Sequence, residues 1–172
     1  MLKYFIRFFV MIFCMVTLAA CGGSETKAAN PSQQVTKSKA TVQVKLTGTL
    51  PAATAISGVE FTINLPTNIT PKNINGIVDS DVVIPSGVFA GSATSTQCIY
   101  SATETTLKVI ITSSVETGVT AIGEVATITL PLTNNSVPST SSFSIASSRV
   151  FDVATISAIS NIGMTVGNVT FE

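Results

Sequence analysis

The amino-acid sequence predicts an all-β fold, a two-sheet antiparallel β-sandwich, on three observations. Beyond residue 40, apolar and polar residues alternate in several segments, which is the period-two pattern of half-buried strands. Glycine and proline separate these segments at short intervals, and no segment has a helical apolar period with capping residues. Threonine, serine, valine and isoleucine are abundant there, a composition that favours strands and polar turns.

The first twenty residues have the pattern of a secretory signal peptide. Lys3 and Arg7 supply a positive start, and residues 8–18 follow without a charge. This apolar run is shorter than the roughly 20 residues that a membrane-spanning helix needs. We therefore expect residues 1–20 to be a signal that is removed on export.

The segment Leu18-Ala19-Ala20-Cys21 resembles the bacterial lipobox. The resemblance implies cleavage before Cys21, a diacylglycerol on the Cys21 thiol and acylation of the new amine by a chain such as palmitate, hence a stable membrane anchor. An ordinary signal peptide with an incidental cysteine is the alternative. Gly22, rather than an aspartate, follows the cysteine, which resembles the outer-membrane sorting default of Gram-negative lipoproteins. We expect a lipid-anchored protein of the bacterial cell envelope, at the outer membrane.

The remaining chain divides into a tether and one domain. Residues 21–39 have almost no apolar content and no period, which predicts a flexible tether beyond the lipidated cysteine. Residues 40–172 are predicted to form a single β-sandwich domain. Expected strands cover residues 41–47, 58–65, 107–111, 124–130, 142–145, 149–151 and 164–171, with shorter candidates at 76–78, 82–84 and 97–101 and a short helical turn near 71–75.

In two of these segments the alternation also predicts which side chains face inward. Within residues 41–47, Val42, Val44 and Leu46 share one face, and within residues 58–65 the valine, phenylalanine, isoleucine and leucine do the same. Pro66 ends the second run, because proline cannot donate a hydrogen bond to a sheet.

Two segments resemble strands of cohesin-type modules. Residues 58–66, Gly-Val-Glu-Phe-Thr-Ile-Asn-Leu-Pro, are similar to an early strand, and residues 123–130, Gly-Glu-Val-Ala-Thr-Ile-Thr-Leu, to a later one. The resemblance implies a jelly-roll sandwich, a fold that cohesins share with some bacterial carbohydrate-binding modules. Leu65-Pro66 stands where those modules have an aromatic residue and Asp-Pro, and none of the family's dockerin-binding residues is carried over. Fold similarity does not transfer function.

Composition argues against catalysis and nucleic-acid binding. The chain has no histidine, which removes the commonest general base and the commonest metal ligand. Lys and Arg number nine against nine Asp and Glu, and no basic patch is visible, so nucleic acid is not an expected partner. Glu60 and Glu124 are interpreted as surface charges rather than a glycosidase pair. We expect neither enzymatic activity nor a cofactor.

Several other residues are candidates for a site. Asp79 and Asp81 could begin a Ca²⁺ site, although the glycine and terminal glutamate of a calcium-binding loop are missing, and a polar turn is the alternative. Cys98 is expected to be a small buried hydrophobe on a strand, with a reactive or pairing thiol as the minority interpretation. Phe89 and Tyr100 are a possible aromatic platform for a sugar, whereas Phe61, Phe143 and Phe171 are expected in the core.

Two functions remain open from the sequence. The leading hypothesis is a membrane-anchored, non-catalytic binding lipoprotein whose β-sandwich recognises a protein partner in the cell envelope. The alternative is a polysaccharide-binding module of an extracellular degradation system. The absence of tryptophan disfavours this alternative, because such modules usually stack aromatic rings on sugars.

Overall fold

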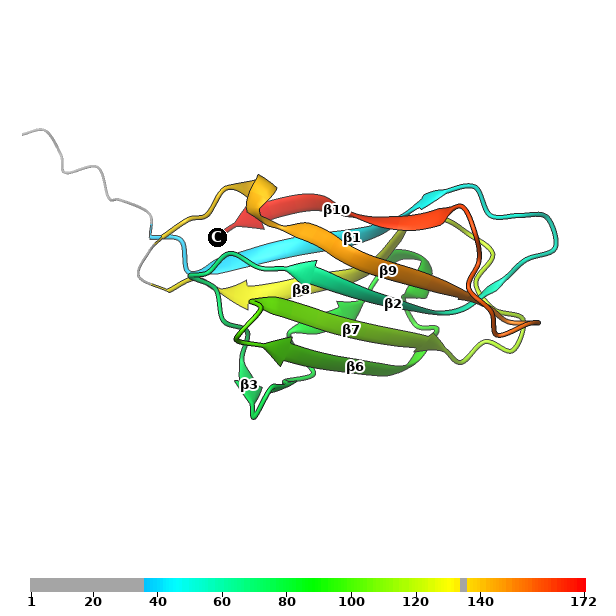
Figure 1. The fold of residues 1–172 in the computed structure, drawn as a ribbon, viewed down its shortest axis with the longest axis horizontal. Helices are drawn as coiled ribbons and strands as arrows, with labels where there is room; N and C mark the ends of the chain where they lie inside the picture. Colours follow the sequence, from blue (N-terminus) through cyan, green and yellow to red (C-terminus); the bar gives the residue numbers. More distant parts are fainter. Residues whose placement is uncertain (1–35, 134–135) are drawn as a thin grey trace, which may run out of the picture. The chain divides into compact units, whose positions relative to one another are not determined.

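The computed structural model describes residues 36–133 and 136–172, so the predicted signal peptide, Cys21 and most of the predicted tether lie outside the described residues. Residues 36–172 form one compact unit. Its strands build two antiparallel sheets that pack face to face, and the predicted all-β sandwich is confirmed (Figure 1).

One sheet has four strands and the other has six. The four-stranded sheet has the order β10 (Ile162–Phe171), β1 (Lys39–Gly48), β8 (Glu124–Pro131) and β5 (Val83–Pro85). The six-stranded sheet has the order β3 (Asn73–Ile74), β4 (Ile77–Val78), β6 (Ala93–Ser101), β7 (Thr106–Ser113), β2 (Ile56–Asn64) and β9 (Ser144–Asp152). Two 3₁₀ turns, η1 (Gly87–Phe89) and η2 (Thr140–Ser142), complete the described elements.

Eight of the strands pair in a nested order. β6 pairs with β7, β5 with β8, β2 with β9 and β1 with β10, as if one long hairpin had been folded over. Successive pairs alternate between the two sheets, and the contacts of β1 with β8 and of β2 with β7 join them. Nested pairs that alternate between two sheets are the pattern of a jelly roll.

The core lies between the sheets and is made by the residues that the alternation predicts. Val42 and Val44 on β1, and Phe61 and Ile63 on β2, are fully buried. Among the described residues no polar or charged residue is buried, so packing of aliphatic and aromatic side chains stabilises the sandwich. An ion pair links the first residue of β1 to Glu172, because Lys39 Nζ lies 2.8 Å from Glu172 Oε2.

The predicted strands are present, but β6 begins at Ala93 rather than at residue 97, and two further places differ from the predictions. The sequence predicts two strands, at residues 142–145 and 149–151, whereas one strand, β9, covers residues 144–152 and Ser142 belongs to η2. The helical turn expected near residues 71–75 is wrong, because that segment enters the β3–β4 hairpin and the 3₁₀ turns lie elsewhere. The reason is the Asn75-Gly76 dipeptide, which favours a two-residue hairpin over a helical turn.

Candidate functional site

The β3–β4 hairpin turns in two residues. Asn75 has φ 51° and Gly76 has φ 85°, the left-handed pair that a type I′ turn requires. Ile74 and Ile77 therefore face each other directly across the turn. The hairpin is attached to the sheet where Ile77 pairs with Ile99 on β6 and where the Tyr100 amide donates to the Gly76 carbonyl at 2.8 Å.

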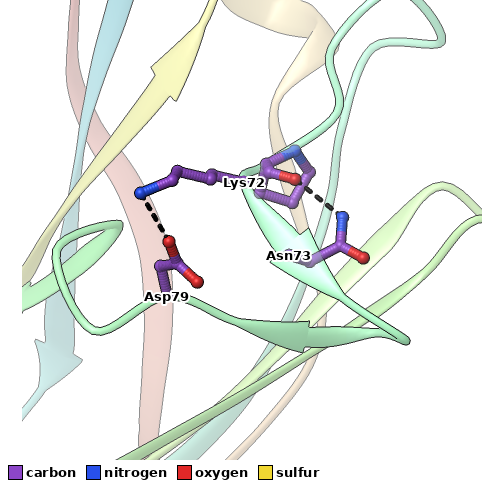
Figure 2. Close-up of polar contacts among 4 residues, drawn as sticks. Lys72, Asn73 and Asp79 are labelled. Carbon is purple, nitrogen blue, oxygen red and sulfur yellow. Dashed lines mark hydrogen bonds and ion pairs between the residues drawn. The ribbon is translucent and has the colours of Figure 1, made fainter.

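Polar contacts fix the base of this hairpin, and Figure 2 shows two of them. Lys72 Nζ lies 2.6 Å from Asp79 Oδ2, and the Asp79 amide donates to the Lys72 carbonyl at 3.1 Å. Asn73 Nδ2 donates to the Pro71 carbonyl at 2.8 Å, and the Gly76 amide donates to Asn73 Oδ1 at 3.2 Å. The hydrogen bond that the Lys72 ammonium donates to Asp79, followed by the charges of Asp79 and Asp81, raises the pKa of Lys72. The hairpin is thus held in a defined conformation at both its base and its turn.

Three isoleucines line up across this corner of the six-stranded sheet. Ile74, Ile77 and Ile99 are 72%, 70% and 56% exposed. Ile77 pairs directly with each of the other two, so the three side chains occupy one row across β3, β4 and β6. We call this row the isoleucine strip. Single exposed aliphatic residues are normal, but adjacent ones in register form a contiguous apolar surface.

Ion pairs border the isoleucine strip. Lys108 on β7 pairs directly with Ile99, and its ammonium lies 2.8 Å from Glu60 Oε1. The Lys72–Asp79 pair lies at the base of the hairpin, two residues along the chain from Ile74 and Ile77. An apolar centre with a polar border is the arrangement found in protein–protein interfaces.

The two candidate catalytic carboxylates, Glu60 and Glu124, lie in different sheets, and each already has a polar partner. Glu60 lies on β2 of the six-stranded sheet and Glu124 on β8 of the four-stranded sheet, so the two do not face each other across one site. Glu60 pairs with Lys108, and Glu124 Oε1 accepts hydrogen bonds from the hydroxyls of Ser86 and Thr127. This arrangement gives neither carboxylate the partner that glycoside hydrolysis needs.

The candidate Ca²⁺ ligands do not converge either. Asp79 is engaged by Lys72, and Asp81 is exposed. Across residues 36–133 and 136–172, no group of three or more acidic or cysteine side chains comes together in a way that could hold a metal ion. The Asp79–Asp81 segment acts as the polar turn that leads from β4 toward β5.

The predicted aromatic platform is wrong for Phe89. Its side chain is fully buried among the core residues at the end of η1, so it cannot stack on a ligand. The backbone explains the difference: Gly87 has φ 55°, and its position lies so close to the Glu124 carbonyl that no larger residue fits, which turns the segment inward. Tyr100 is half-buried against the core. Phe61 and Phe143 are buried as expected, whereas Phe171, which is also expected in the core, is only partly buried.

Cys98 is buried on β6, as the sequence predicts. Burial raises the pKa of the Cys98 thiol to about 11, so the reactive thiolate is scarce at neutral pH. Cys21, the predicted lipidation site, lies outside the described residues.

An open groove of about 360 Å³ runs beside the free edge of β10. The 3₁₀ turn η2, Phe143 and residues 166–169 line it. Its polar lining comes from the hydroxyls of Thr140 and Ser141 and from the Asn168 amide, with no charged group. Such a lining does not by itself select a ligand class.

Sequence reasoning did not find the isoleucine strip. The available signal was the dipeptide Asn75-Gly76 between two isoleucines, which is the strongest short-range indication of a hairpin. Nothing local to Ile99 indicates that it completes the row, because its pairing with Ile77 joins distant parts of the chain.

No protein-family model, no curated protein and no solved structure matches this chain. The resemblance to cohesin-type modules therefore rests on residues 58–66 and 123–130 alone. In the part of the chain that the structure describes, no helix is long and apolar enough to cross a membrane.

Proposed function

We propose that the protein is a lipid-anchored, non-catalytic binding module of the bacterial cell envelope, and that its cohesin-like sandwich recognises a protein partner through the isoleucine strip. One observation carries this proposal: Ile74, Ile77 and Ile99 are exposed side by side in strand register. Leaving such a surface in water is unfavourable, and contiguous exposed apolar patches often mark interaction sites.

The surroundings of the strip favour a protein over a polysaccharide. Protein interfaces combine an apolar centre with a polar rim, which the Lys72–Asp79 and Lys108–Glu60 pairs supply here. Sugar rings are usually bound by stacked aromatic residues. With Phe89 buried, Tyr100 is left as a half-buried aromatic residue without its expected companion.

The anchor part of the proposal rests on residues 18–22 of the sequence. It predicts that the protein fractionates with membranes and that Cys21→Ser releases it into the soluble fraction. A Cys21→Ser protein that still sediments with membranes contradicts lipidation at this residue.

Photo-crosslinking in intact cells tests the binding surface. Benzoylphenylalanine is placed at position 77 in the full chain, with position 156 as the matched control, because Ile156 is also an exposed isoleucine, at 78%, and lies outside the strip. We expect protein adducts from position 77 at least five-fold above those from position 156. Equal yields, or no adduct at position 77, refute the strip as the contact surface. Binding of a polysaccharide panel that Tyr100→Ala abolishes favours the glycan alternative instead.

A further inference from the structure

We propose that the protein partner is a second copy of this chain, so that the isoleucine strips of two molecules anchored in the same membrane pack against each other. This inference rests on the proposed function and names its partner. Its starting point is the symmetry of the strip. Ile77 lies in the middle, and one isoleucine lies on each side of it, Ile74 on β3 and Ile99 on β6.

A two-fold axis through the middle of the strip makes it complementary to itself. The axis places Ile77 of one molecule against Ile77 of the second copy, and Ile74 against Ile99 of the second copy. Such an isologous contact needs the same patch on both molecules and is the commonest symmetry of protein oligomers. The strip contains isoleucine at all three positions, so neither half needs a different partner surface.

The charges around the strip permit two identical faces to meet. Like charges on identical surfaces normally repel each other across a two-fold axis. Here the Lys108 ammonium lies 2.8 Å from a Glu60 carboxylate oxygen, and the Lys72 ammonium lies 2.6 Å from an Asp79 carboxylate oxygen. Each bordering cation is therefore neutralised within its own molecule.

The small size of the strip limits where this contact can form. A stable complex in solution usually buries about 800 Å² on each partner, and three side chains supply much less than that. A shared membrane compensates, because anchoring confines both molecules to one surface and raises their effective concentration. The predicted tether between Cys21 and β1 has a typical span of roughly 25 Å if it behaves as a flexible chain, which lets neighbouring domains reach each other. We therefore expect association of the anchored protein and a monomer without the anchor.

Disulfide trapping at the centre of the strip tests the inference. The mature lipidated protein carrying Ile77→Cys is reconstituted in phosphatidylcholine vesicles and oxidised with copper phenanthroline. The native Cys98 does not compete, because it is buried and its thiol pKa is about 11. Ile156→Cys is the matched control: its residue is exposed, and the β9–β10 connection that carries it lies at the other end of the sandwich from β3 (Figure 1).

We expect disulfide-linked dimers of Ile77→Cys at least five-fold above those of Ile156→Cys. Adding Cys21→Ser, which removes the anchor, reduces the yield at least ten-fold at the same protein concentration. Adding Ile74→Ser and Ile99→Ser to the anchored protein also reduces the yield of disulfide-linked dimers. Circular dichroism establishes that this variant is folded. Equal yields at positions 77 and 156, or no dimer at position 77, overturn the inference.

The two proposals fail in different ways. If Ile77→Cys gives no dimer in vesicles but benzoylphenylalanine at position 77 captures a different envelope protein in cells, the proposed function stands and the second copy is excluded. If the photo-adducts at position 77 are lipids, the strip contacts the membrane, and both proposals are wrong. If position 77 gives no adduct in cells and no dimer in vesicles, both are also refuted.

Discussion

Two neighbouring connections of the sandwich place their apolar residues in opposite environments, one exposed and the other buried. The connection from β2 to β5 contains the β3–β4 hairpin and exposes Ile74 and Ile77, whereas the connection from β5 to β6 contains η1 and buries Phe89. Both segments contain a left-handed glycine, Gly76 in the first and Gly87 in the second. The turn type decides the outcome, because a two-residue hairpin keeps its flanking residues on one strand face, and a 3₁₀ turn rotates a side chain inward.

An apolar residue on a connection between strands therefore does not by itself indicate whether its side chain is buried or exposed. Phe89 contributes to the hydrophobic core, whereas Ile74 and Ile77 of the hairpin are exposed to solvent. Val78, directly after Ile77, takes the buried position of β4, so strand alternation forces Ile77 outward. Stability measurements therefore separate the two connections.

The largest effect is expected from Phe89→Ala. Because the ring is fully buried, its removal leaves a cavity and costs about 3–5 kcal/mol in the free energy of unfolding. Urea denaturation followed by circular dichroism measures the change. Tyr100→Ala, at a half-buried ring, is the control and loses less. A Phe89→Ala protein with wild-type stability contradicts the burial of this connection.

A series of three glycine-to-alanine variants compares the turns themselves. A left-handed conformation costs a non-glycine residue about 1–2 kcal/mol, which we expect for Gly91→Ala, where an added Cβ meets nothing within 4 Å. Gly76→Ala is expected to cost slightly more, because its Cβ lies 3.1 Å from the Tyr100 carbonyl oxygen. Gly87→Ala is expected to cost the most, since its Cβ lies 2.3 Å from the Glu124 carbonyl oxygen. Urea denaturation measures the stability that each variant loses. A greater loss of stability for Gly76→Ala than for Gly87→Ala contradicts the expected order.

The sequence predicted the sandwich well because its long strands carry their pattern locally. Alternation marks β1, β2, β8 and β10 without reference to any other part of the chain. The connections behave differently, since the burial of Phe89 depends on Gly87 packing against Glu124 on β8. The isoleucine strip was not predicted for a similar reason, because it depends on the pairing of Ile77 with Ile99.

A third connection, from β9 to β10, also exposes an isoleucine. Ile156 in the β9–β10 connection is exposed and has φ 55°, a conformation that a β-branched residue rarely adopts. Ile156→Gly removes about 1–2 kcal/mol of backbone strain, and the greater chain entropy of glycine offsets part of the gain, for a net stabilisation of about 0.5–1 kcal/mol. Urea denaturation measures this gain. A loss of stability shows that the Ile156 side chain makes a contribution that its exposure does not suggest.

The smallest effect concerns the ion pair at the base of the hairpin. Asp79 and Asp81 raise the pKa of Lys72 above its ordinary value of 10.5, so the charged lysine favours the folded state. This contribution is fully present below about pH 10.5 and is lost as the pH rises through the raised pKa. Because Lys72 is exposed, salt screens the pair. The stability difference between wild type and Lys72→Met, measured from pH 7 to pH 12, should be small and should vanish at the alkaline end; a difference that grows with pH has the wrong sign for this account.

The central claim is that the isoleucine strip serves contact with another molecule rather than folding. The most direct measurement combines two readouts on one variant, Ile74→Ser with Ile99→Ser, in the chain that carries benzoylphenylalanine at position 77. The account predicts a free energy of unfolding within about 1 kcal/mol of the parent chain, since both side chains are exposed, together with a loss of most of the protein adducts in cells. Undiminished adducts at unchanged stability contradict the claim, as does a large loss of stability, which makes the strip part of the folded core.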